Sequence, residues 1–499
     1  MQKKRTLLSP ITILMIVVIL AALATWIVPA GRYDTLSYNE NSFTLNKDST
    51  QVILASGPRT LDSLQINISL DKFQAGAIRK PVAVPGTFHK LPKNSQGFID
   101  ILKAPLNGII ESIDIILFLL IIGGFMNVFH ETGAMVQGLT ALSYRMKGRE
   151  AWLIIILTFL FSFAGSSYGM AEEALVFYPV LIPLFLAAGY DLLVPLAVIF
   201  GGTQLGTLSS FSNPFSTIIA SNAAGVTWSD GLTERVLMFM ISTAITIWYI
   251  VRYAQKIKKD PSKSIVYKTD GKVSSPYEMI SEKITSAQKL SARTRFLLML
   301  FLCTFLTMIC GVVWFDWWLL EMSTLFLGAA ILIALIVRLN ENKFIAQFIK
   351  GAEGLLGVSF IVGVARGVTI VLNNGQISDS ILFYSSNLVS GMPPALFIIV
   401  LLMLYMVFTL FISSSSGMAV LTMPIIGGLA VMVNVPGREI VNSYLFGMGI
   451  MGFMTPTGLI LPSLALAHVS LKAWWKFIYP LLIILFMLCA AFLIAGLYL

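Results

Sequence analysis

The chain has 499 residues, of which 57% are hydrophobic and only 12% charged, and its mean hydropathy is +0.83. This composition excludes an ordinary soluble domain, because apolar runs of about 20 residues are typical of membrane spans. The formal net charge of +9 lies mostly in polar loops, so it does not predict nucleic-acid binding. The three cysteines fall in apolar runs and the three histidines are scattered, which predicts no disulfide framework, metal cluster or cofactor.

The N-terminal segment, residues 1–30, predicts a first transmembrane span with a cytoplasmic N-terminus. A basic start precedes the apolar run 11–29, which is longer than a usual signal-peptide core, and no clean cleavage site precedes Arg32. Residues 31–107 are polar and predict an extracytoplasmic loop. Its alternating segments 42–45 and 51–54 predict short strands.

Residues 108–253 form the first of two similar halves. We expect a span at 108–130, a hairpin at 151–187, a broken span at 192–224 and a span at 235–253. The hairpin has two short apolar arms around a Gly/Ser-rich tip at 165–173, which predicts a re-entrant loop entered from the cytoplasmic side. In the broken span Pro214 removes a backbone donor, and such a break is tolerated only where it lines a cavity inside the protein.

The segment 254–295 predicts a cytoplasmic linker between the halves, because eleven Lys and Arg residues lie between 252 and 295. Residues 296–338 predict two further spans. The second half, 339–499, contains a span at 352–372, a hairpin at 395–433, a broken span at 438–468 and a last span at 477–497. The count is nine spans and two hairpins, with the C-terminus outside.

The two halves share motifs in the same order. Residues 166–171 read Ser-Ser-Tyr-Gly-Met-Ala and residues 414–419 read Ser-Ser-Ser-Gly-Met-Ala, each between short apolar arms. Some forty residues later each half has a proline-containing break, at 212–216 and at 455–457. The first copy starts outside and the second inside. Inverted repeats with discontinuous helices are typical of secondary transporters whose site lies near the bilayer midplane.

These motifs also resemble a known family. The tip 165–173, the break 212–217, the segment 364–367 and the second tip 413–419 resemble the YfcC branch of the DcuC-type anaerobic carriers, within the ion transporter superfamily. The resemblance covers nearly the whole chain. It implies a multi-pass protein of the bacterial inner membrane, a homodimer, and an elevator mechanism in which hairpins and broken helices move against a fixed scaffold. Divalent-anion relatives carry Ser-Asn-Thr at each tip, whereas neither tip here contains Asn.

The expected fold is therefore an all-α polytopic membrane protein, an inverted-repeat elevator-type transporter with two re-entrant hairpins and two broken helices. Its expected partners are a small-molecule substrate and the lipid bilayer. We expect tips, breaks and one cationic side chain to bind the substrate: Ser166, Ser167, Glu172, Glu173, Ser212, Asn213, Pro214, Ser414, Ser415, Thr455, Thr457 and Arg366. Oxygen-rich positions are expected to bind Na⁺ as the coupling ion: Ser166, Gly206, Ser209, Asn213, Ser413, Ser416 and Thr455.

Charged side chains inside the membrane predict function. Glu172 and Glu173 are adjacent, so they should point in different directions. We expect one of the two glutamates to lie at the site, and a helix-capping role is the alternative. Coupling to H⁺ through Glu172 or Glu173 is the alternative to coupling to Na⁺. Arg366 either pairs with a protein carboxylate, which we favour, or binds a substrate carboxylate.

A carboxylate beside the site favours a substrate with an amino group, and helix N-termini favour a carboxylate on the same molecule. These features predict ion-coupled transport, by symport or antiport, of an amino acid, a basic one included, or of a small peptide. A C4-dicarboxylate is the alternative substrate. Two other classes are weaker: an ion channel, and an intramembrane hydrolase in which the G-x-S-x-G match at 165–169 would make Ser167 a nucleophile. The recurrence of the tip argues against an enzyme.

Overall fold

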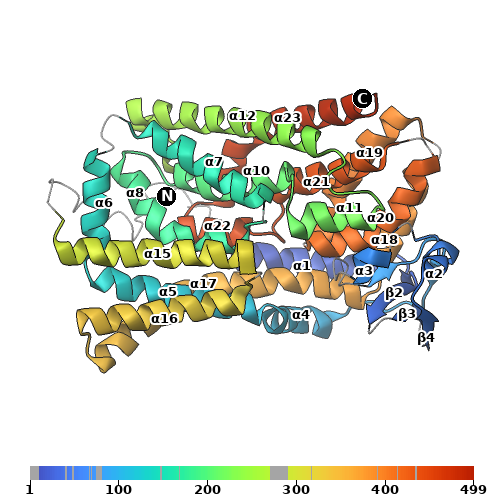
Figure 1. Ribbon diagram of the computed structural model, residues 1–499, viewed down its shortest axis with the longest axis horizontal. Coiled ribbons are helices and arrows are strands. Elements are labelled where there is room, and N and C mark those ends of the chain that lie inside the picture. The colour runs from blue at the N-terminus through green and yellow to red at the C-terminus, as the bar shows by residue number, and fades with distance from the viewer. Residues whose placement is uncertain are drawn as a thin grey trace, which may run out of the picture.

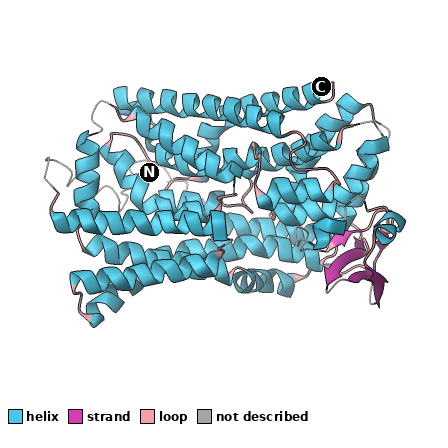
Figure 2. Cartoon of the chain, in the orientation of Figure 1, coloured by secondary structure: helices cyan, strands magenta, loops and turns pink. Residues whose placement is uncertain are grey.

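The protein is a bundle of long helices with a small β-structure at one end (Figures 1 and 2). The computed structural model describes residues 10–498 except 40–41, 48–49, 67, 69, 75–80, 146–148, 168, 270–289, 316, 390–391, 413 and 433–434. Among the described residues, seven helices are long and apolar enough to cross a membrane. Apolar runs of this length fold as helices because the helix satisfies every backbone polar group internally. The seven are α1 Pro10–Ile27, α5 Ile113–Glu131, α12 Leu232–Lys259, α16 Leu319–Val337, α17 Glu341–Asn374, α19 Pro394–Phe411 and α23 Leu471–Gly496.

The segment after α1 forms a cap at the end of the bundle where the C-terminus also lies (Figure 1). Both predicted strands are confirmed, and they pair with each other as β3 and β4 in an antiparallel sheet of order β4-β3-β2-β5. Leu36 lies opposite Leu45, and both are buried with Phe43 under the sheet. The cap elements are β1 Gly31–Arg32, β2 Thr35–Asn39, β3 Ser42–Lys47, β4 Thr50–Ala55, α2 Pro58–Ser63, α3 Leu70–Gln74, β5 Val82–Ala83 and β6 His89–Lys90.

The predicted span 108–130 was wrong at its start. Helix α4, Phe98–Glu111, begins ten residues earlier and is separated from α5 at Ser112. Asp100 starts α4 by accepting a 2.9 Å hydrogen bond from the Gly97 amide, a capping signal that lay inside the expected polar loop. Helix α4 packs on α17 through Gly108, where a Cβ would come within 2.0 Å of the Gly363 carbonyl oxygen.

Helices α15 Ala292–Phe315, α16 and α17 occupy the predicted scaffold region and the span that follows it. Helix α17 is longer than the predicted span 352–372 at both ends. Its N-terminal extension is stabilised by Asn340, whose side chain accepts a 3.0 Å hydrogen bond from the Asn342 amide. Helices α5 and α17 lie side by side, as Figure 1 also shows.

The hairpin and broken helix of the first half are both present. Helix α10 ends at Leu208 and the chain turns helical again at Pro214, the proline that predicted the break. The elements are α6 Ala134–Arg145, which was not predicted, α7 Ala151–Ser167, a 3-10 helix Glu172–Phe177, α8 Tyr178–Ala187, α9 Leu193–Leu196, a π-helix Ala197–Gly201, α10 Gly202–Leu208, a π-helix Pro214–Ile218 and α11 Ile219–Ala223. Within the expected linker, a 3-10 turn Pro261–Lys263 and α13 Ile265–Thr269 follow α12.

The second half repeats this order. A long helix, a short helix, a hairpin, a broken helix and a long helix occur as α5 to α12 and again as α17 to α23. The remaining elements are α18 Ser378–Val389, α20 Ser415–Met432, α21 Gly437–Gly452 and α22 Ile460–Ala467. Figure 1 places α6 at one end of the molecule and α18 towards the other, beside the cap, so the two copies run in opposite directions.

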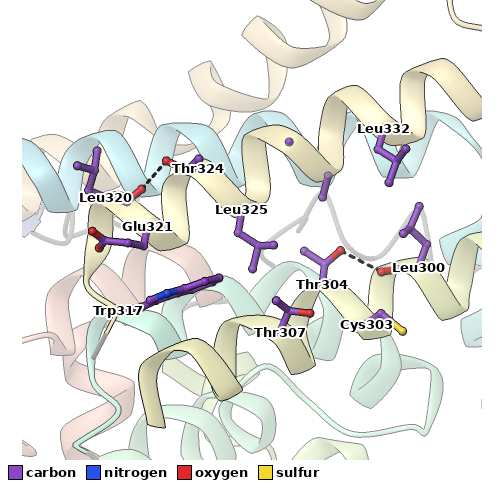
Figure 3. A pocket seen from close by; sticks show the side chains of 12 residues that line it. Leu300, Cys303, Thr304, Thr307, Trp317, Leu320, Glu321, Thr324, Leu325 and Leu332 are labelled. Carbon is purple, nitrogen blue, oxygen red and sulfur yellow. Dashed lines mark hydrogen bonds between the residues drawn. The ribbon is translucent and has the colours of Figure 1, made fainter. Parts of the chain in front are cut away.

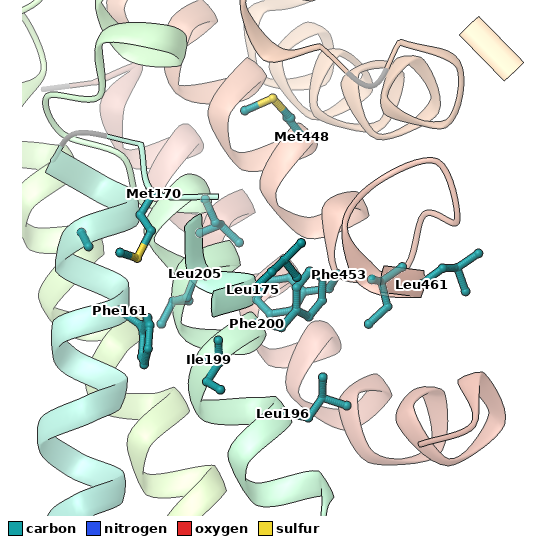
Figure 4. Packing of buried hydrophobic residues seen from close by; sticks show 14 of the residues in the cluster. Phe161, Met170, Leu175, Leu196, Ile199, Phe200, Leu205, Met448, Phe453 and Leu461 are labelled. Atoms are coloured by element: carbon teal, nitrogen blue, oxygen red, sulfur yellow. The ribbon is translucent and has the colours of Figure 1, made fainter. Parts of the chain in front are cut away.

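The two broken helices share one apolar core (Figure 4). Phe200, which precedes α10, lies edge-on against Phe453 and Trp474, with ring centroids 6.3 and 5.6 Å apart. The fully buried Trp474 donates a 2.9 Å hydrogen bond from Nε1 to the carbonyl of Phe453, one residue after α21 ends. This packing joins the helical segment before the first break to the end of α21.

Candidate functional site

The tip of the first hairpin is hydrogen-bonded to the first break. The Ser166 hydroxyl donates to the Ser209 carbonyl at 2.8 Å and accepts from the Phe211 amide at 3.2 Å. The Ser166 carbonyl in turn accepts the Ser212 amide at 3.2 Å, and the Ser212 hydroxyl donates to the Ser167 carbonyl at 3.1 Å. The hairpin thus satisfies backbone groups that the end of α10 exposes.

Glycines allow this close contact. A Cβ on Gly206 would lie 2.2 Å from the Ser162 carbonyl oxygen, and one on Gly165 would lie 2.5 Å from the Thr203 carbonyl oxygen. Gly169, within the tip, has a φ of +86°, a region that favours glycine. The sequence placed Gly206 in an ion site, but in the structure it lies against the hairpin backbone.

The side chain of Asn213 forms hydrogen bonds both within the break and to the hairpin tip. Its Oδ1 accepts hydrogen bonds from the amides of Phe215 at 2.8 Å and Ser216 at 3.3 Å, capping the π-helix that Pro214 begins. Its Nδ2 donates to the Gly165 carbonyl at 3.2 Å. One amide side chain therefore ends the break and holds the hairpin.

The second hairpin and break lie close to the first. Ser414 caps α20 by accepting from the Gly417 amide at 3.1 Å. The Ser415 hydroxyl donates across the repeats to the Phe215 carbonyl at 3.3 Å. In the second break the hydroxyls of Thr455 and Thr457 lie 2.8 Å apart. Ser413, predicted as an ion ligand, lies outside the described residues.

Both hairpins and both breaks line one cavity of about 1770 Å³. Most of the predicted site residues contribute to its wall: Ser167, Glu172, Glu173, Ser212, Asn213, Arg366, Ser414, Ser415, Ser416, Thr455 and Thr457. Three others do not line it, because Ser166 and Ser209 are fully buried in the tip-to-break contacts and Gly206 packs on the hairpin. Pro214 is placed by its backbone at the start of the π-helix.

The adjacent glutamates take different positions. Glu173 is 6% exposed, and its Oε2 accepts a 2.9 Å hydrogen bond from the Ala171 amide at the start of the second arm. Glu172 is more exposed and lines the cavity, as Asp114 and Arg366 also do. The capping role therefore belongs to Glu173, while Glu172 has the geometry for contact with a bound solute.

Two acidic residues of this wall were missed by the sequence reasoning. Glu111 ends α4 and Asp114 begins α5, on either side of the interruption at Ser112, and both line the cavity. The signal was present, because two carboxylates fell within the predicted span 108–130 and charges at membrane depth predict function. Arg366 pairs with Glu111, Nε to Oε2 at 3.2 Å, which supplies the protein carboxylate that we favoured as its partner.

A second, smaller pocket of about 620 Å³ lies between α15 and α16 (Figure 3). Its wall is mainly apolar, with Leu300, Leu325 and Leu332 among its side chains. Glu321 is the one carboxylate in this wall, and it accepts a 2.9 Å hydrogen bond from the Trp318 amide as the cap of α16. This pocket shares none of the predicted site residues.

The hydrolase alternative finds no support at the tip. Ser167 ends helix α7, and its hydroxyl donates at 2.7 Å to the carbonyl of Phe163 in the same helix. A nucleophile elbow instead requires a strand, a sharp turn and a helix.

A bundle of long apolar helices with a cavity between two hairpins and two broken helices is the architecture of a polytopic membrane transporter. The family model described as "C4-dicarboxylate anaerobic carrier", DcuC, matches residues 7–498. The chain belongs to the DcuC family.

Two relatives are similar over almost their whole length. An uncharacterized protein of Haemophilus influenzae (strain ATCC 51907 / DSM 11121 / KW20 / Rd) is 39% identical over 492 residues, covering 96% of this chain and 95% of the relative. YfcC of Escherichia coli (strain K12), named as a proposed basic amino acid antiporter, is 28% identical over 510 residues, covering 97% and 95%.

Two solved transporters are similar in structure. Neisseria gonorrhoeae MtrF, described among antimetabolite efflux pumps, has a TM-score of 0.42 at 15% identity and covers 98% of this chain and 95% of its own. The Alcanivorax borkumensis YdaH transporter has a TM-score of 0.38 at 13% identity, with 97% of each chain covered. Similarity at this level transfers neither a site nor a mechanism to this chain.

Proposed function

We propose that this protein is an ion-coupled secondary transporter of amino acids, with basic amino acids as the preferred class and small peptides as the next. One observation carries the proposal. The described cavity wall contains four carboxylates, Glu111, Asp114, Glu172 and Glu173, and one cationic side chain, Arg366. Carboxylates therefore outnumber cationic side chains in this wall, which favours a solute with positive charge.

A C4-dicarboxylate is the second candidate, because the family description names that substrate class. A dianion in this cavity would face four acidic side chains and a single guanidinium that already has a carboxylate partner. Like charges in a partly desolvated site raise the free energy of binding. The name of YfcC, a relative 28% identical, agrees with the cationic class.

The carboxylate of an amino acid also has a favourable partner at this site. Helix α20 starts at Ser415 beside the cavity, and its N-terminus carries positive partial charge. The cavity volume of about 1770 Å³ exceeds the roughly 300–1,000 Å³ of typical small-ligand pockets. It has room for an amino acid with water, or for a small peptide.

The coupling ion is proposed to be Na⁺, with H⁺ as the alternative. Buried oxygen atoms cluster beside the first break, where the hydroxyl of Ser210 lies 2.6 Å from that of Thr217 and 3.4 Å from that of Ser216. Hard cations select such oxygen ligands. Coupling to H⁺ would instead use Glu172, which lines the cavity, whereas Glu173 accepts a hydrogen bond from the Ala171 amide.

The proposed cycle is an elevator movement in a homodimer of the bacterial inner membrane, with a cytoplasmic N-terminus. The hairpins and broken helices, which contact one another through Ser166 and Ser415, would move together. Helices α4, α5 and α17, which pack along each other, would form the fixed wall. Glu172 and Arg366 then belong to opposite walls of the cavity.

The decisive experiment combines thermal-shift binding with uptake by proteoliposomes. We expect lysine, arginine or ornithine to stabilise the purified protein, because a ligand that binds the native state raises its stability by mass action. Glu172→Gln should abolish uptake and leave the melting temperature of the free protein near that of wild type. Glu321→Gln, which alters a carboxylate outside the cavity, is the matched control. Stabilisation by succinate or fumarate, with none by any amino acid, would restore the dicarboxylate candidate.

The coupling ion is tested by imposing sodium and pH gradients separately. Uptake that follows the sodium gradient at constant pH supports Na⁺. Uptake that needs no sodium and follows the pH gradient would replace it with H⁺.

A further inference from the structure

The ion pair between Arg366 and Glu111 is more exposed than the ion pairs made by Arg438. The two side chains are 38% and 51% exposed, and both face the cavity. Arg438, in contrast, contacts Glu234 and Glu439 through Nε, each at 3.3 Å, and also donates to the Gly496 carbonyl. Arg438 is thus fully used in holding helices together, whereas Arg366 is available to a solute.

The guanidinium of Arg366 uses one nitrogen for this pair. Its Nε donates to Oε2 of Glu111 at 3.2 Å, and the two terminal nitrogens make no hydrogen bond to any described residue. A guanidinium binds a carboxylate best through two parallel N–H bonds. The observed pair is therefore monodentate, and a carboxylate that forms the stronger, bidentate pair can take the place of Glu111.

We propose that Arg366 is the subsite for the α-carboxylate of the substrate, and that Glu111 occupies it as an internal substitute until the substrate arrives. This inference rests on the function proposed above and narrows it to solutes that carry an α-carboxylate and a cationic group together. Amines that lack the carboxylate are poor substrates. Glu111 acts as a specificity-determining residue, because any solute must compete with it for the guanidinium.

The free energy of the pair is small enough for this exchange. A salt bridge between half-exposed side chains contributes little to stability, so an incoming carboxylate displaces Glu111 at little cost. A fully buried pair would instead leave an uncompensated charge when broken.

The rest of the wall suits the cationic end of such a solute. Glu172 and Asp114 line the same cavity as Arg366, so the carboxylate subsite and the acidic side chains face the same bound solute. Glu111, once displaced, still faces the same cavity. The acidic groups then available to an ammonium or guanidinium group are Glu111, Asp114 and Glu172.

The experiment compares amino acids with their decarboxylated counterparts. Thermal-shift titrations of the purified full-length protein use L-arginine against agmatine and L-lysine against cadaverine. In wild type we expect each amino acid to bind at least tenfold more tightly than its amine. Arg366→Gln should remove this preference and leave binding of the amine within about threefold of wild type, which also shows that the variant is folded.

Glu111→Gln separates this subsite from a structural ion pair. Removal of the competing carboxylate should strengthen amino-acid binding severalfold and keep the preference over the amine. If the pair only stabilises the fold, Glu111→Gln and Arg366→Gln should weaken binding alike. Glu353→Gln, which alters an exposed carboxylate on α17 outside the cavity wall, should behave as wild type.

The outcomes distinguish this inference from the proposed function. An Arg366→Gln variant that still prefers amino acids over amines, or an equal loss of binding in the Glu111 variant, overturns the carboxylate subsite and leaves amino-acid transport standing. A wild-type protein stabilised by dicarboxylates alone overturns the proposed function itself.

Discussion

Replacement of Gly206 by alanine should separate the first hairpin from the first broken helix. The new Cβ would lie 2.2 Å from the Ser162 carbonyl oxygen, 2.7 Å from the Ser166 amide nitrogen and 2.9 Å from the Gly165 carbonyl carbon. All three are backbone atoms, which cannot rotate away as a side chain can. Overpacking of this kind costs about 1–3 kcal/mol, and we expect the upper end of that range because the whole tip must shift.

The assay is thermal unfolding of the purified protein together with uptake by proteoliposomes. Gly206→Ala should lower the melting temperature and reduce uptake, because the shifted tip loses the bond from Ser166 to the break and the bond from Asn213 to the tip. Gly201→Ala is the matched control, since its Cβ would lie 4.0 Å from the side chains of Ala197 and Trp474, an ordinary van der Waals distance. Equal melting temperatures for the two variants would refute the close packing of hairpin and break.

Three further predictions follow from single contacts. Ser166→Ala should lower the free energy of unfolding by about 1–3 kcal/mol, because it leaves the carbonyl of the fully buried Ser209 without its partner. Ser167→Ala should be nearly neutral in thermal unfolding, and similar losses in both variants would contradict the tip-to-break bonds. Asn213→Ala should lower the free energy of unfolding by about 1–2 kcal/mol, because the π-helix loses its N-cap. Asn213→Ser keeps a capping oxygen and should recover part of that stability, so no recovery would argue against the N-cap. Asp379 accepts a hydrogen bond from the amide of Tyr33 in the cap, and burial raises the pKa of its carboxyl group. The folded state therefore binds the proton of Asp379 more tightly than the unfolded chain does. Attachment of the cap should weaken as the pH rises above about 4, the ordinary pKa of an aspartate. Hydrogen exchange of residues 31–39 should show this trend in wild type and lose it in Asp379→Asn; an unchanged trend in the variant would assign it to another group.

The sequence by itself determined the class of protein and the location of its breaks. Apolar runs long enough to cross a bilayer specify helices without reference to neighbours, because lipid offers no partner for a backbone amide or carbonyl. Pro214 ends a helix through its own covalent structure, and the helical path resumes at that residue. The repeated tips at 166–171 and 414–419 predicted two hairpins, and both lie against breaks around one cavity.

Other features needed the tertiary structure, because they depend on which side of a helix a residue faces. Ser166 and Ser167 are equivalent in the sequence, yet Ser166 is buried against the break and Ser167 lines the cavity. Likewise, Glu173 caps the second arm and Glu172 lines the cavity.

The pairing of Glu111 with Arg366 joins residues 255 positions apart, so no local pattern contains it. Local sequence signals favour the start and end of a helix. Which charged side chains lie opposite one another across a cavity is decided only when the helices pack. In this protein the packing of α4 on α17 through Gly108 brings Glu111 to Arg366 and makes the balance of charge in the cavity a property of the folded chain.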